Sequence, residues 1–546
     1  MPTVAERVAQ VLGAHATEVF GLLGNGNAFV VDALLRLTDA RYTAVRHETA
    51  TVASADAYWR ASGKLAIATT TYGAGFTNTL TSLAEAAMAH CPMIVLVGDE
   101  PTSGRRPWDV DQVALARACG VETITVTAQT PGADTVRALE LALGGGTPVV
   151  LALPYDLPTA KTTEPEFNPQ LSLPEPAQPS AEGIEKLAAL LAGAARPVIL
   201  GGVGARDAGS ELAELADRLG AITVTTAPAR GLFAGRKLDA GVCGGFSSPR
   251  TADYLGQADL VVAFGAGLNQ FTMGFGGLFP QATLAQVGIA ESPTHPAVSE
   301  YLRADARAAA LSLLDAIAGP EHDTWPGLVA DEVADAQFDR GERPELAADG
   351  RLDPRGLISA IDAQLPDNRL VCTDGGHFIG WPNTHLRVPS VGSMVLVGTH
   401  YQSIGLGFPS APGAAVAAGE RMLVVPTGDG GGLMGLADLD SLVRSARRAT
   451  VVVFNDAAYT AETTQYGTLG LDQRPMRIDE VDFAQLALGV GAHSTVVRHL
   501  SDLDSWAAWC TAGGEGTWVL DCRISGEVIA PYQREIMANL RRSVGK

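Results

Sequence analysis

Short runs of β-forming residues alternate with helical patterns along most of the chain, and no other feature restricts the fold as much. Consecutive parallel strands need a crossover between them, usually a helix, so this alternation predicts parallel sheets covered by helices on both faces. In the first third of the chain we expect strands near residues 19–23, 42–46, 65–71, 93–97, 123–127 and 148–153. This set is sufficient for one doubly wound domain.

Two further units of the same kind follow. The second has expected strands near residues 197–200, 222–226, 260–264 and 283–287, and the third near 369–373, 394–397, 422–426, 450–454, 494–498 and 517–522. Prolines recur between residues 158 and 179, which favours an extended linker, and Asp353-Pro354 has the pattern of a helix N-cap followed by proline. We therefore predict an α/β protein of three doubly wound parallel-sheet domains, over residues 1–157, 181–345 and 350–546, with a linker over residues 158–180.

Composition and charge exclude several classes of protein. Apolar residues make up 47% of the 546 residues, and no apolar run approaches the roughly 18 residues of a membrane span, so we expect a globular protein outside the membrane. The net charge of -21 disfavours nucleic acid and anionic membranes as partners, and an anionic ligand would need a metal ion or backbone N–H groups. The six scattered cysteines form no CxxC pair and the first residues show no signal-peptide pattern, so we expect reduced thiols and a cytoplasmic location.

The strongest chemical signal is a pair of polar strand ends in the third unit. One expected strand runs into Gly428-Asp429-Gly430-Gly431, and the next ends in Asn455-Asp456. Consecutive parallel strands deliver their C-terminal ends to the same sheet edge, so Asp429 and Asn455 should meet there. Carboxylate, amide and backbone carbonyl oxygens suit Mg²⁺ or Ca²⁺ holding a diphosphate, and the glycines would leave N–H groups for phosphate oxygens. The alternative is a turn aspartate and a strand-end asparagine with structural roles only.

The motif Gly428-Asp429-Gly430 followed by Asn455-Asp456 resembles the thiamine diphosphate motif of the family that includes acetolactate synthase, pyruvate decarboxylase and benzoylformate decarboxylase. Four other segments resemble motifs of that family and occur in the same order: Arg46-His47-Glu48, Thr71-Tyr72-Gly73-Ala74-Gly75-Phe76-Thr77-Asn78, Asp374-Gly375-Gly376-His377 and Ile404-Gly405-Leu406-Gly407-Phe408-Pro409. The resemblance implies pyrimidine-binding, central and diphosphate-binding domains, in that order along the chain.

The resemblance also implies a thiamine diphosphate site with Mg²⁺. Glu48 would exchange a proton with N1′ of the cofactor's aminopyrimidine, and its apolar neighbours lead us to expect a buried carboxyl group with a raised pKa. The alternative for Glu48 is a carboxylate that only stabilises a helix start. Because the family places this glutamate and the diphosphate on different subunits, the active sites would lie at the interface of a homodimer or homotetramer.

The implied cofactor residues are Glu48, Gly376, His377, Gln402, Ile404, Asp429, Gly430, Gly431, Asn455 and Ala457. Asp429, Asn455 and the Ala457 carbonyl would hold the metal. The Gln402 carbonyl would contact the pyrimidine. Ile404 would support the bent cofactor, or it could be a core residue.

Three residues resemble the family's substrate contacts. Asn25, in the turn after the first expected strand, corresponds to a substrate-binding Asp or Ser of decarboxylases, although a structural turn asparagine is an equal alternative. Gln112 lies near the Gln of a Phe-Gln-Glu segment in acetolactate synthases, but the flanking residues differ here. Glu462, in Tyr459-Thr460-Ala461-Glu462, resembles the Tyr-Thr-x-Glu of pyruvate-type decarboxylases, with one extra residue before the tyrosine. Together with Glu48, these three residues are the catalytic candidates.

The central unit carries a weaker signal. Gly201-Gly202-Val203-Gly204 follows an expected strand but lacks the complete dinucleotide pattern. Acetolactate synthases bind flavin in the corresponding domain with the help of an arginine-rich stretch, and this chain has Gly265-Ala266-Gly267-Leu268-Asn269-Gln270-Phe271 there. FAD is therefore an open alternative and not a prediction.

The resemblance implies an enzyme that makes or breaks a bond next to a carbonyl. We expect decarboxylation of a 2-oxo acid and carboligation of the acyl carbanion to an aldehyde or ketone acceptor, as in acetolactate synthases. One alternative is a simple decarboxylase or lyase that releases an aldehyde, which Glu462 favours. Alternatives of other classes are a non-catalytic binding protein that keeps the family fold and a nicotinamide-dependent dehydrogenase.

Overall fold

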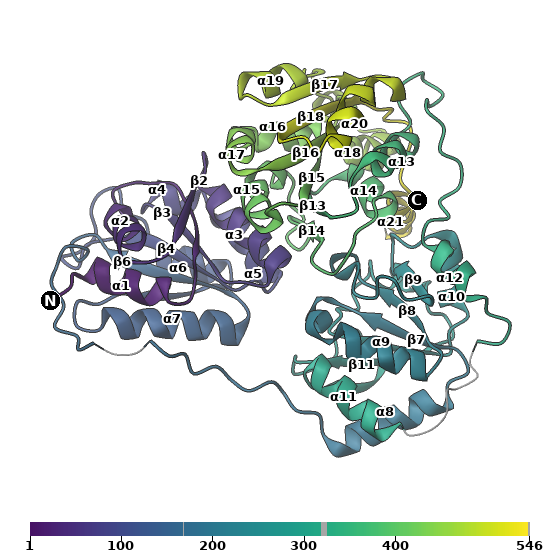
Figure 1. The fold of residues 1–546 in the computed structure, drawn as a ribbon, viewed down its shortest axis with the longest axis horizontal. Coiled ribbons are helices and arrows are strands. Elements are labelled where there is room, and N and C mark those ends of the chain that lie inside the picture. Colours follow the sequence, from purple (N-terminus) through teal and green to yellow (C-terminus); the bar gives the residue numbers. More distant parts are fainter. Residues whose placement is uncertain (167–168, 318–324, 544–546) are drawn as a thin grey trace.

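Three separate parallel sheets organise the molecule, and each occupies its own lobe in Figure 1. The computed structural model describes residues 1–166, 169–317 and 325–543. Every hydrogen-bonded pair among the named strands is parallel, which confirms the predicted α/β class with three doubly wound sheets.

The first sheet has the strand order β2-β1-β3-β4-β6-β5. Its strands are β1 (Glu18–Gly21), β2 (Arg41–Ala44), β3 (Ala66–Thr70), β4 (Met93–Asp99), β5 (Glu122–Thr125) and β6 (Pro148–Pro154). The helices are α1 (Val4–Gly13), α2 (Ala28–Leu37), α3 (Thr49–Ser62), α4 (Ala74–Thr77), α5 (Leu80–Met88), α6 (Gln112–Ala118) and α7 (Pro131–Gly145).

The central sheet has the order β12-β11-β10-β7-β8-β9. Its strands are β7 (Pro197–Gly201), β8 (Ile222–Thr225), β9 (Asp239–Val242), β10 (Leu260–Phe264), β11 (Thr283–Gly288) and β12 (Val298–Arg303). The helices are α8 (Ala181–Gly193), α9 (Gly209–Arg218), α10 (Pro249–Gly256), α11 (Ala306–Ala316) and α12 (Ala330–Ala336).

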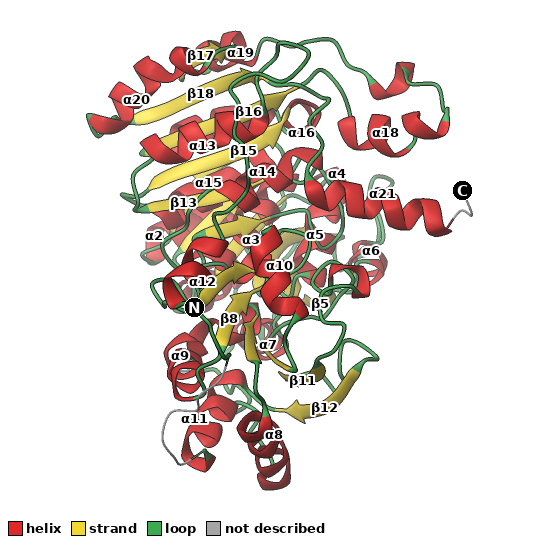
Figure 2. Ribbon diagram, turned by 90° about the vertical axis from the view of Figure 1, so that its right-hand side faces the viewer, coloured by secondary structure: helices red, strands yellow, loops and turns green. Residues whose placement is uncertain are grey.

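The third sheet has the order β14-β13-β15-β16-β18-β17. Its strands are β13 (Arg369–Thr373), β14 (Met394–Leu396), β15 (Met422–Gly428), β16 (Arg448–Asn455), β17 (His493–Val497) and β18 (Gly516–Arg523). The helices are α13 (Pro354–Gln364), α14 (Gly380–His385), α15 (Gly407–Ala418), α16 (Asp429–Met434), α17 (Ala437–Ser445), α18 (Thr460–Gln465), α19 (Phe483–Gly489), α20 (Asp504–Thr511) and α21 (Pro531–Ser543). Figure 2 shows α21 extending away from this sheet, with the C-terminus at its free end.

The expected strands all appear, but the sequence reading missed β9 and β12 in the central sheet. Both are edge strands, and edge strands lack the continuous apolar pattern of a strand buried on both faces. In β12 only Leu302 is buried, and β9 contains Gly241 with φ 83°. The expected helix start at residue 353 is present, because the Asp353 side chain accepts a hydrogen bond from the Arg355 N–H and Pro354 occupies the first turn. The domain boundaries themselves stay predictions.

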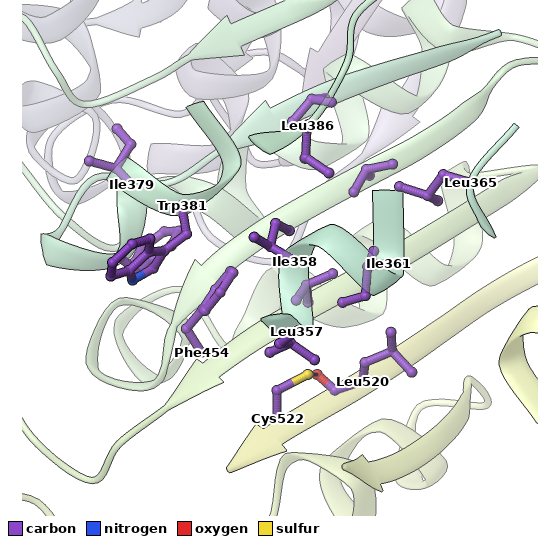
Figure 3. Close-up of a cluster of buried hydrophobic side chains, with 14 of the residues drawn as sticks. Leu357, Ile358, Ile361, Leu365, Ile379, Trp381, Leu386, Phe454, Leu520 and Cys522 are labelled. Carbon is purple, nitrogen blue, oxygen red and sulfur yellow. Dashed lines mark hydrogen bonds between the residues drawn. The ribbon is translucent and has the colours of Figure 1, made fainter. Parts of the chain in front are cut away.

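The third sheet is stabilised by a large apolar core on its α13 side. Figure 3 shows Leu357, Ile358 and Ile361 of α13 facing Phe454 and Leu520 on the strands, and all five side chains are buried. Burial of each such side chain contributes about 1.5–3 kcal/mol relative to exposure. This core fixes the strands whose C-terminal ends form the candidate site.

Helices α3 and α15 pack closely, and this contact joins the first and third domains (Figure 1). The Ser54 hydroxyl donates a hydrogen bond to the Pro409 carbonyl at 2.8 Å. A Cβ atom at Gly413 would lie 1.8 Å from the Ser54 carbonyl oxygen, so only glycine permits this crossing. Among the described helices, none combines the length and the apolar character that crossing a bilayer requires.

Candidate active site

A cleft lies at the C-terminal edge of the third sheet. The strand order places the switch point of this sheet between β13 and β15, which is where ligands of open α/β sheets bind. The cleft contains most of the predicted cofactor residues and one catalytic candidate: Gly376, His377, Ile404, Asp429, Gly430, Gly431 and Glu462. Residues that the sequence reading did not single out also line it, among them Phe378, Asp456 and Tyr459.

Asp429 and Asn455 come together at this edge, where Gly428 on β15 pairs with Phe454 on β16. The Asp429 carboxylate accepts hydrogen bonds from the N–H groups of Gly430 at 2.8 Å and Ala457 at 2.7 Å. Burial, together with the nearby charge of Asp456, raises the pKa of Asp429 to about 7. A nearby cation would favour the ionised form of this buried carboxyl group.

The side-chain amide of Asn455 is completely buried, and the hydrogen bonds of its NH₂ group fix its orientation. That group donates to the Asp521 carboxylate at 2.9 Å and to the Val481 carbonyl at 3.0 Å. Oδ1 of Asn455 is left without a hydrogen-bond partner in the described part of the chain. A buried unpartnered oxygen is costly, and next to a carboxylate it has the chemistry of a ligand for a hard cation such as Mg²⁺.

Ala457, the third predicted metal ligand, adopts φ 59°, a left-handed conformation that is unusual for a residue with a Cβ atom. Its N–H is bound to Asp429, and its carbonyl accepts a hydrogen bond from the Ile478 N–H at 3.1 Å. A carbonyl oxygen has two lone pairs, so one remains for a further contact.

The two glycines after Asp429 have no room for a side chain. A Cβ atom at Gly430 would lie 2.5 Å from Cε1 of Tyr459, and one at Gly431 would lie 2.4 Å from Oδ2 of Asp374. The expectation of free N–H groups needs a correction for Gly430, whose N–H donates to its neighbour Asp429. Gly431 is in the first turn of α16, where N–H groups lack a partner within the helix.

Asp374 organises the cleft, although the sequence reading did not select it. Its fully buried carboxylate accepts hydrogen bonds from the N–H groups of Gly375 at 2.8 Å, Gly405 at 3.1 Å and Leu406 at 3.1 Å, and from the Thr427 hydroxyl at 3.2 Å. Burial raises its pKa to about 6. These bonds tie the loops after β13, before α15 and at the end of β15 to one another. In the sequence, the position of Asp374 at the end of an expected strand and before two glycines could have indicated this role.

Glu85, in the first domain, holds the loop that carries Gln402 and Ile404. This completely buried side chain of α5 accepts hydrogen bonds from the N–H groups of His400 at 2.9 Å and Tyr401 at 2.7 Å. Ile404 lines the cleft, whereas Gln402 is exposed and has φ 57°. The first domain therefore contributes directly to the shape of the third-domain loop.

His377 is buried at the cleft wall. Burial lowers its pKa to about 4, so the imidazole is neutral at physiological pH, and its Nε2 atom has no hydrogen-bond partner among the described residues. The Tyr532 hydroxyl donates to the His377 carbonyl at 2.7 Å and thereby connects α21 to this wall. A neutral imidazole nitrogen remains available for a ligand in the cleft.

Glu48 lies at the start of α3, on the C-terminal edge of the first sheet. It is half-buried within one chain, so the expected full burial is not found there. Its Oε2 atom accepts a hydrogen bond from the Asn78 amide at 2.9 Å. No residue of the first domain lines the third-domain cleft in the described part of the chain, so the structure does not bring Glu48 and Asp429 into one cleft of a single chain.

The other first-domain candidates lie along the same sheet edge. Asn27 makes the structural hydrogen bonds of its turn, accepting from the Gly24 N–H at 2.8 Å and donating to the Leu22 carbonyl at 3.0 Å, while Asn25 is exposed. Gln112 is buried, and its amide bonds the Gly73 N–H at 2.7 Å and the Gly98 carbonyl at 2.9 Å. Gln112 thus links the glycine-rich turn at Gly73 to the end of β4 at Gly98.

Glu462 projects from the first turn of α18, is exposed and lines the same cleft as Asp429. The extra residue before Tyr459 does not remove Glu462 from this cleft.

The glycine-rich segment of the central domain has a structural role. The Gly204 N–H donates to the Gly265 carbonyl at 2.9 Å, and a Cβ atom at Gly202 would lie 2.2 Å from that same oxygen. These glycines therefore pack the loops after β7 and β10 against each other.

Comparison with family models gives three matches in chain order. They are the N-terminal TPP binding domain of thiamine pyrophosphate enzymes over residues 2–135, the central domain of these enzymes over residues 184–314, and their C-terminal TPP binding domain over residues 374–522. Each match contains one of the three sheets almost completely.

The chain also resembles characterised proteins over nearly its full length. It is 28% identical to sulfoacetaldehyde acetyltransferase of Rhodobacter capsulatus, covering 98% of this chain and 96% of that protein. It is 26% identical to acetolactate synthase isozyme 1 large subunit of Escherichia coli, covering 92% and 90%. The solved thiamine diphosphate-dependent 4-hydroxybenzoylformate decarboxylase of Rhodococcus jostii superposes with a TM-score of 0.79 at 21% identity, over 96% of this chain and 99% of that one, which shows a shared fold.

Proposed function

Because the chain belongs to the thiamine pyrophosphate enzyme family, we propose that it uses thiamine diphosphate and Mg²⁺ to decarboxylate a 2-oxo acid and to join the acyl group to an aldehyde or ketone acceptor. The observation that supports this proposal most is the unpartnered, buried Oδ1 of Asn455, which follows the paired strand ends Gly428 and Phe454 directly behind the cleft that Asp429 lines. Relatives named as an acetyltransferase and an acetolactate synthase favour carboligation.

The third domain would hold the cofactor by its diphosphate end. The Asp429 carboxylate, Oδ1 of Asn455 and the Ala457 carbonyl would ligate Mg²⁺, and Gly431 and His377 would face the phosphate oxygens. When bound, thiamine diphosphate supplies a carbon nucleophile and an electron sink for the bond next to a carbonyl. In a chain with a net charge of -21, the metal and these N–H groups would offset the general repulsion of a diphosphate.

The first domain would supply the proton-transfer group. Glu48 would hold and move the proton at N1′ of the aminopyrimidine, and Ile404 would support the cofactor from the third domain. Since Glu48 is half-buried and lies outside the cleft of its own chain, we propose that it reaches the cleft of a second copy, in a homodimer or homotetramer. Burial in that interface would then provide the apolar surroundings that the single chain lacks.

Three residues would act on the substrate side. Asn25 is exposed at the same sheet edge as Glu48 and would contact the substrate carboxylate. Gln112, whose amide supports Gly73, would act as a positioning residue. Glu462 lines the cleft and would handle a proton of the substrate. This position of Glu462 also favours a second candidate function, simple decarboxylation with release of an aldehyde.

The test is incubation of the protein with thiamine diphosphate, Mg²⁺ and a panel of 2-oxo acids, with and without aldehyde acceptors. CO₂ release and NMR of the products distinguish carboligation from aldehyde release. Glu48→Gln should slow turnover at least about 100-fold, whereas Glu122→Gln, at an exposed position of β5, should be neutral. Wild-type turnover in Glu48→Gln would disprove the role of Glu48, and no product from any 2-oxo acid would disprove the proposed reaction.

A further inference from the structure

A second cavity, of about 380 Å³, lies beside β9, an edge strand of the central sheet. Its walls come from residues 225–242, from residues 334–338 around the end of α12, and from residues 387–388 of the third domain. It shares no lining residue with the third-domain cleft. It also lies away from the switch point of the central sheet between β7 and β10, where open α/β sheets generally bind ligands.

The cavity is strongly basic in a chain that is acidic overall. Four cationic side chains line it, namely Arg230, Arg236, Lys237 and Arg387, against two carboxylates, Asp239 and Asp335. Asp239 is buried, and burial raises the pKa of this carboxyl group to about 7, which reduces its charge at neutral pH. The walls therefore carry an excess of positive charge although the whole chain has a net charge of -21.

Arg236 provides a donor that no protein group uses. Its side chain is 7% exposed; Nε donates to the Asp217 carboxylate at 2.8 Å and Nη1 to the Thr223 hydroxyl at 3.4 Å. Nη2 is buried and has no hydrogen-bond partner among the described residues. Burying a guanidinium N–H without an acceptor is costly, so an acceptor atom placed next to Nη2 would be stabilising. The adjacent Lys237 is exposed and forms no ion pair within the described chain.

Arg230, one of the four lining cations, has further arginines next to it outside the cavity lining. Arg230 donates to the Asn383 carbonyl at 2.8 Å and the Leu386 carbonyl at 2.7 Å, so its donors bind the main chain at the end of α14 and not a carboxylate. Burial, followed by the charges of Arg230 and Arg343, lowers the pKa of Arg340 to about 9. These arginines repel one another, and an anion in the cavity would relieve that repulsion.

Two of the four cationic side chains of the cavity, Arg387 and Arg236, are each paired with one carboxylate outside it. Asp362 bonds Arg369 at 2.8 Å and Arg387 at 2.8 Å, and Asp217 bonds Arg236 only through Nε. We propose that this cavity binds a small dianion of the phosphate class, with Nη2 of Arg236 and the Lys237 ammonium group as its direct contacts and Arg387 at the rim. Such an ion presents several acceptor oxygens and two charges, which matches the unused donors and the charge excess.

The experiment is calorimetric titration of the holoenzyme, loaded with thiamine diphosphate and Mg²⁺, with inorganic phosphate against sodium chloride of equal ionic strength. Loading the cofactor first occupies the diphosphate cleft, so a remaining saturable phosphate signal reports a second site. Arg236→Gln and Lys237→Ala should each weaken phosphate binding about tenfold or more. Arg303→Gln, which removes an exposed arginine of the same domain, should leave it unchanged.

Equal phosphate affinity in Arg236→Gln, Lys237→Ala and wild type would overturn the proposal, and so would a chloride titration that gives the same signal. Lys237 is exposed, so its substitution keeps the test valid even if Arg236→Gln does not fold. Parallel titrations with glycerol phosphate and a nucleoside monophosphate identify the source of the phosphate group. Tighter binding of either than of inorganic phosphate would indicate a phosphorylated metabolite, and weaker binding of both would indicate free phosphate.

Discussion

Replacing Glu85 with glutamine should loosen the loop that carries Gln402 and Ile404 and thereby weaken thiamine diphosphate binding. Burial alone would raise the pKa of Glu85, but the hydrogen bonds and charges of His400 and Arg60 lower it from 4.5 to about 2. Since one pKa unit corresponds to about 1.4 kcal/mol, the surroundings favour the charged carboxylate by about 3 kcal/mol. A neutral glutamine loses this preference and also turns an NH₂ group toward N–H donors.

The consequence for the loop follows from its contacts. Glu85 binds two consecutive N–H groups of the loop, those of His400 and Tyr401, and the next residue, Gln402, has an unfavourable left-handed conformation. If binding of thiamine diphosphate must restore this loop, a loss of about 3 kcal/mol corresponds to an affinity about 100-fold lower. Mg²⁺ binding at Asp429 should change little, because the Asp429 carboxylate is held by the N–H groups of Gly430 and Ala457, which lie outside this loop.

The assay is calorimetric titration of thiamine diphosphate at saturating Mg²⁺, combined with thermal unfolding of the unloaded protein. Glu291→Gln is the matched control, because its ion pair with Arg303 is exposed and contributes at most about 1 kcal/mol. Glu85→Asp should recover part of the affinity, since it restores the charge. An affinity of Glu85→Gln within twofold of wild type would refute the argument that Glu85 positions the loop.

Three further predictions follow from the same contacts. Asn455→Leu removes the unpartnered Oδ1 and should lower Mg²⁺ affinity at least about tenfold in a metal titration, and unchanged affinity would exclude Asn455 as a ligand. Ala457→Gly should raise the free energy of unfolding by up to about 1 kcal/mol in urea titrations, because glycine accepts φ 59° without strain, whereas Ala461→Gly in α18 should lower it. Because the pKa of Glu85 is lowered on folding, its contribution is present above pH 4.5 and is lost as the pH falls toward 2. Wild type should therefore lose more stability than Glu85→Gln across that interval in pH-dependent unfolding, and parallel curves would contradict this.

Much of the fold and part of the site could be predicted from local pattern. Most strands of the first and third sheets are apolar runs, and all of them were expected. The central edge strands β9 and β12 were missed because polar residues or glycine interrupt their apolar residues, although β9 is buried throughout. The same logic predicted the meeting of Asp429 and Asn455, since consecutive parallel strands end at one edge.

The hydrogen-bond partners of individual polar atoms could not be predicted from the sequence pattern. Gln112 was expected near the substrate, yet its amide supports Gly73, and the Gly430 N–H was expected to be free, yet it binds Asp429. Glu85 had no distinctive local pattern, and the strand-end position of Asp374 before two glycines did not reveal its partners, although both side chains are completely buried anchors of the cleft loops. The side-chain partners of a buried charge are chosen by packing, which sequence spacing does not encode.

The amino-acid sequence by itself thus determined the three parallel sheets, the edge where the polar strand ends meet and, through ordered motifs, the resemblance to thiamine diphosphate enzymes. It could do so because strand and helix periods are local properties of the chain. Only the tertiary structure decided that Oδ1 of Asn455 is left without a partner in the described chain, that Glu85 reaches the third-domain loop, and that Gln112 supports Gly73. These outcomes depend on how whole domains pack, and the hydrogen bonds that result join residues hundreds of positions apart.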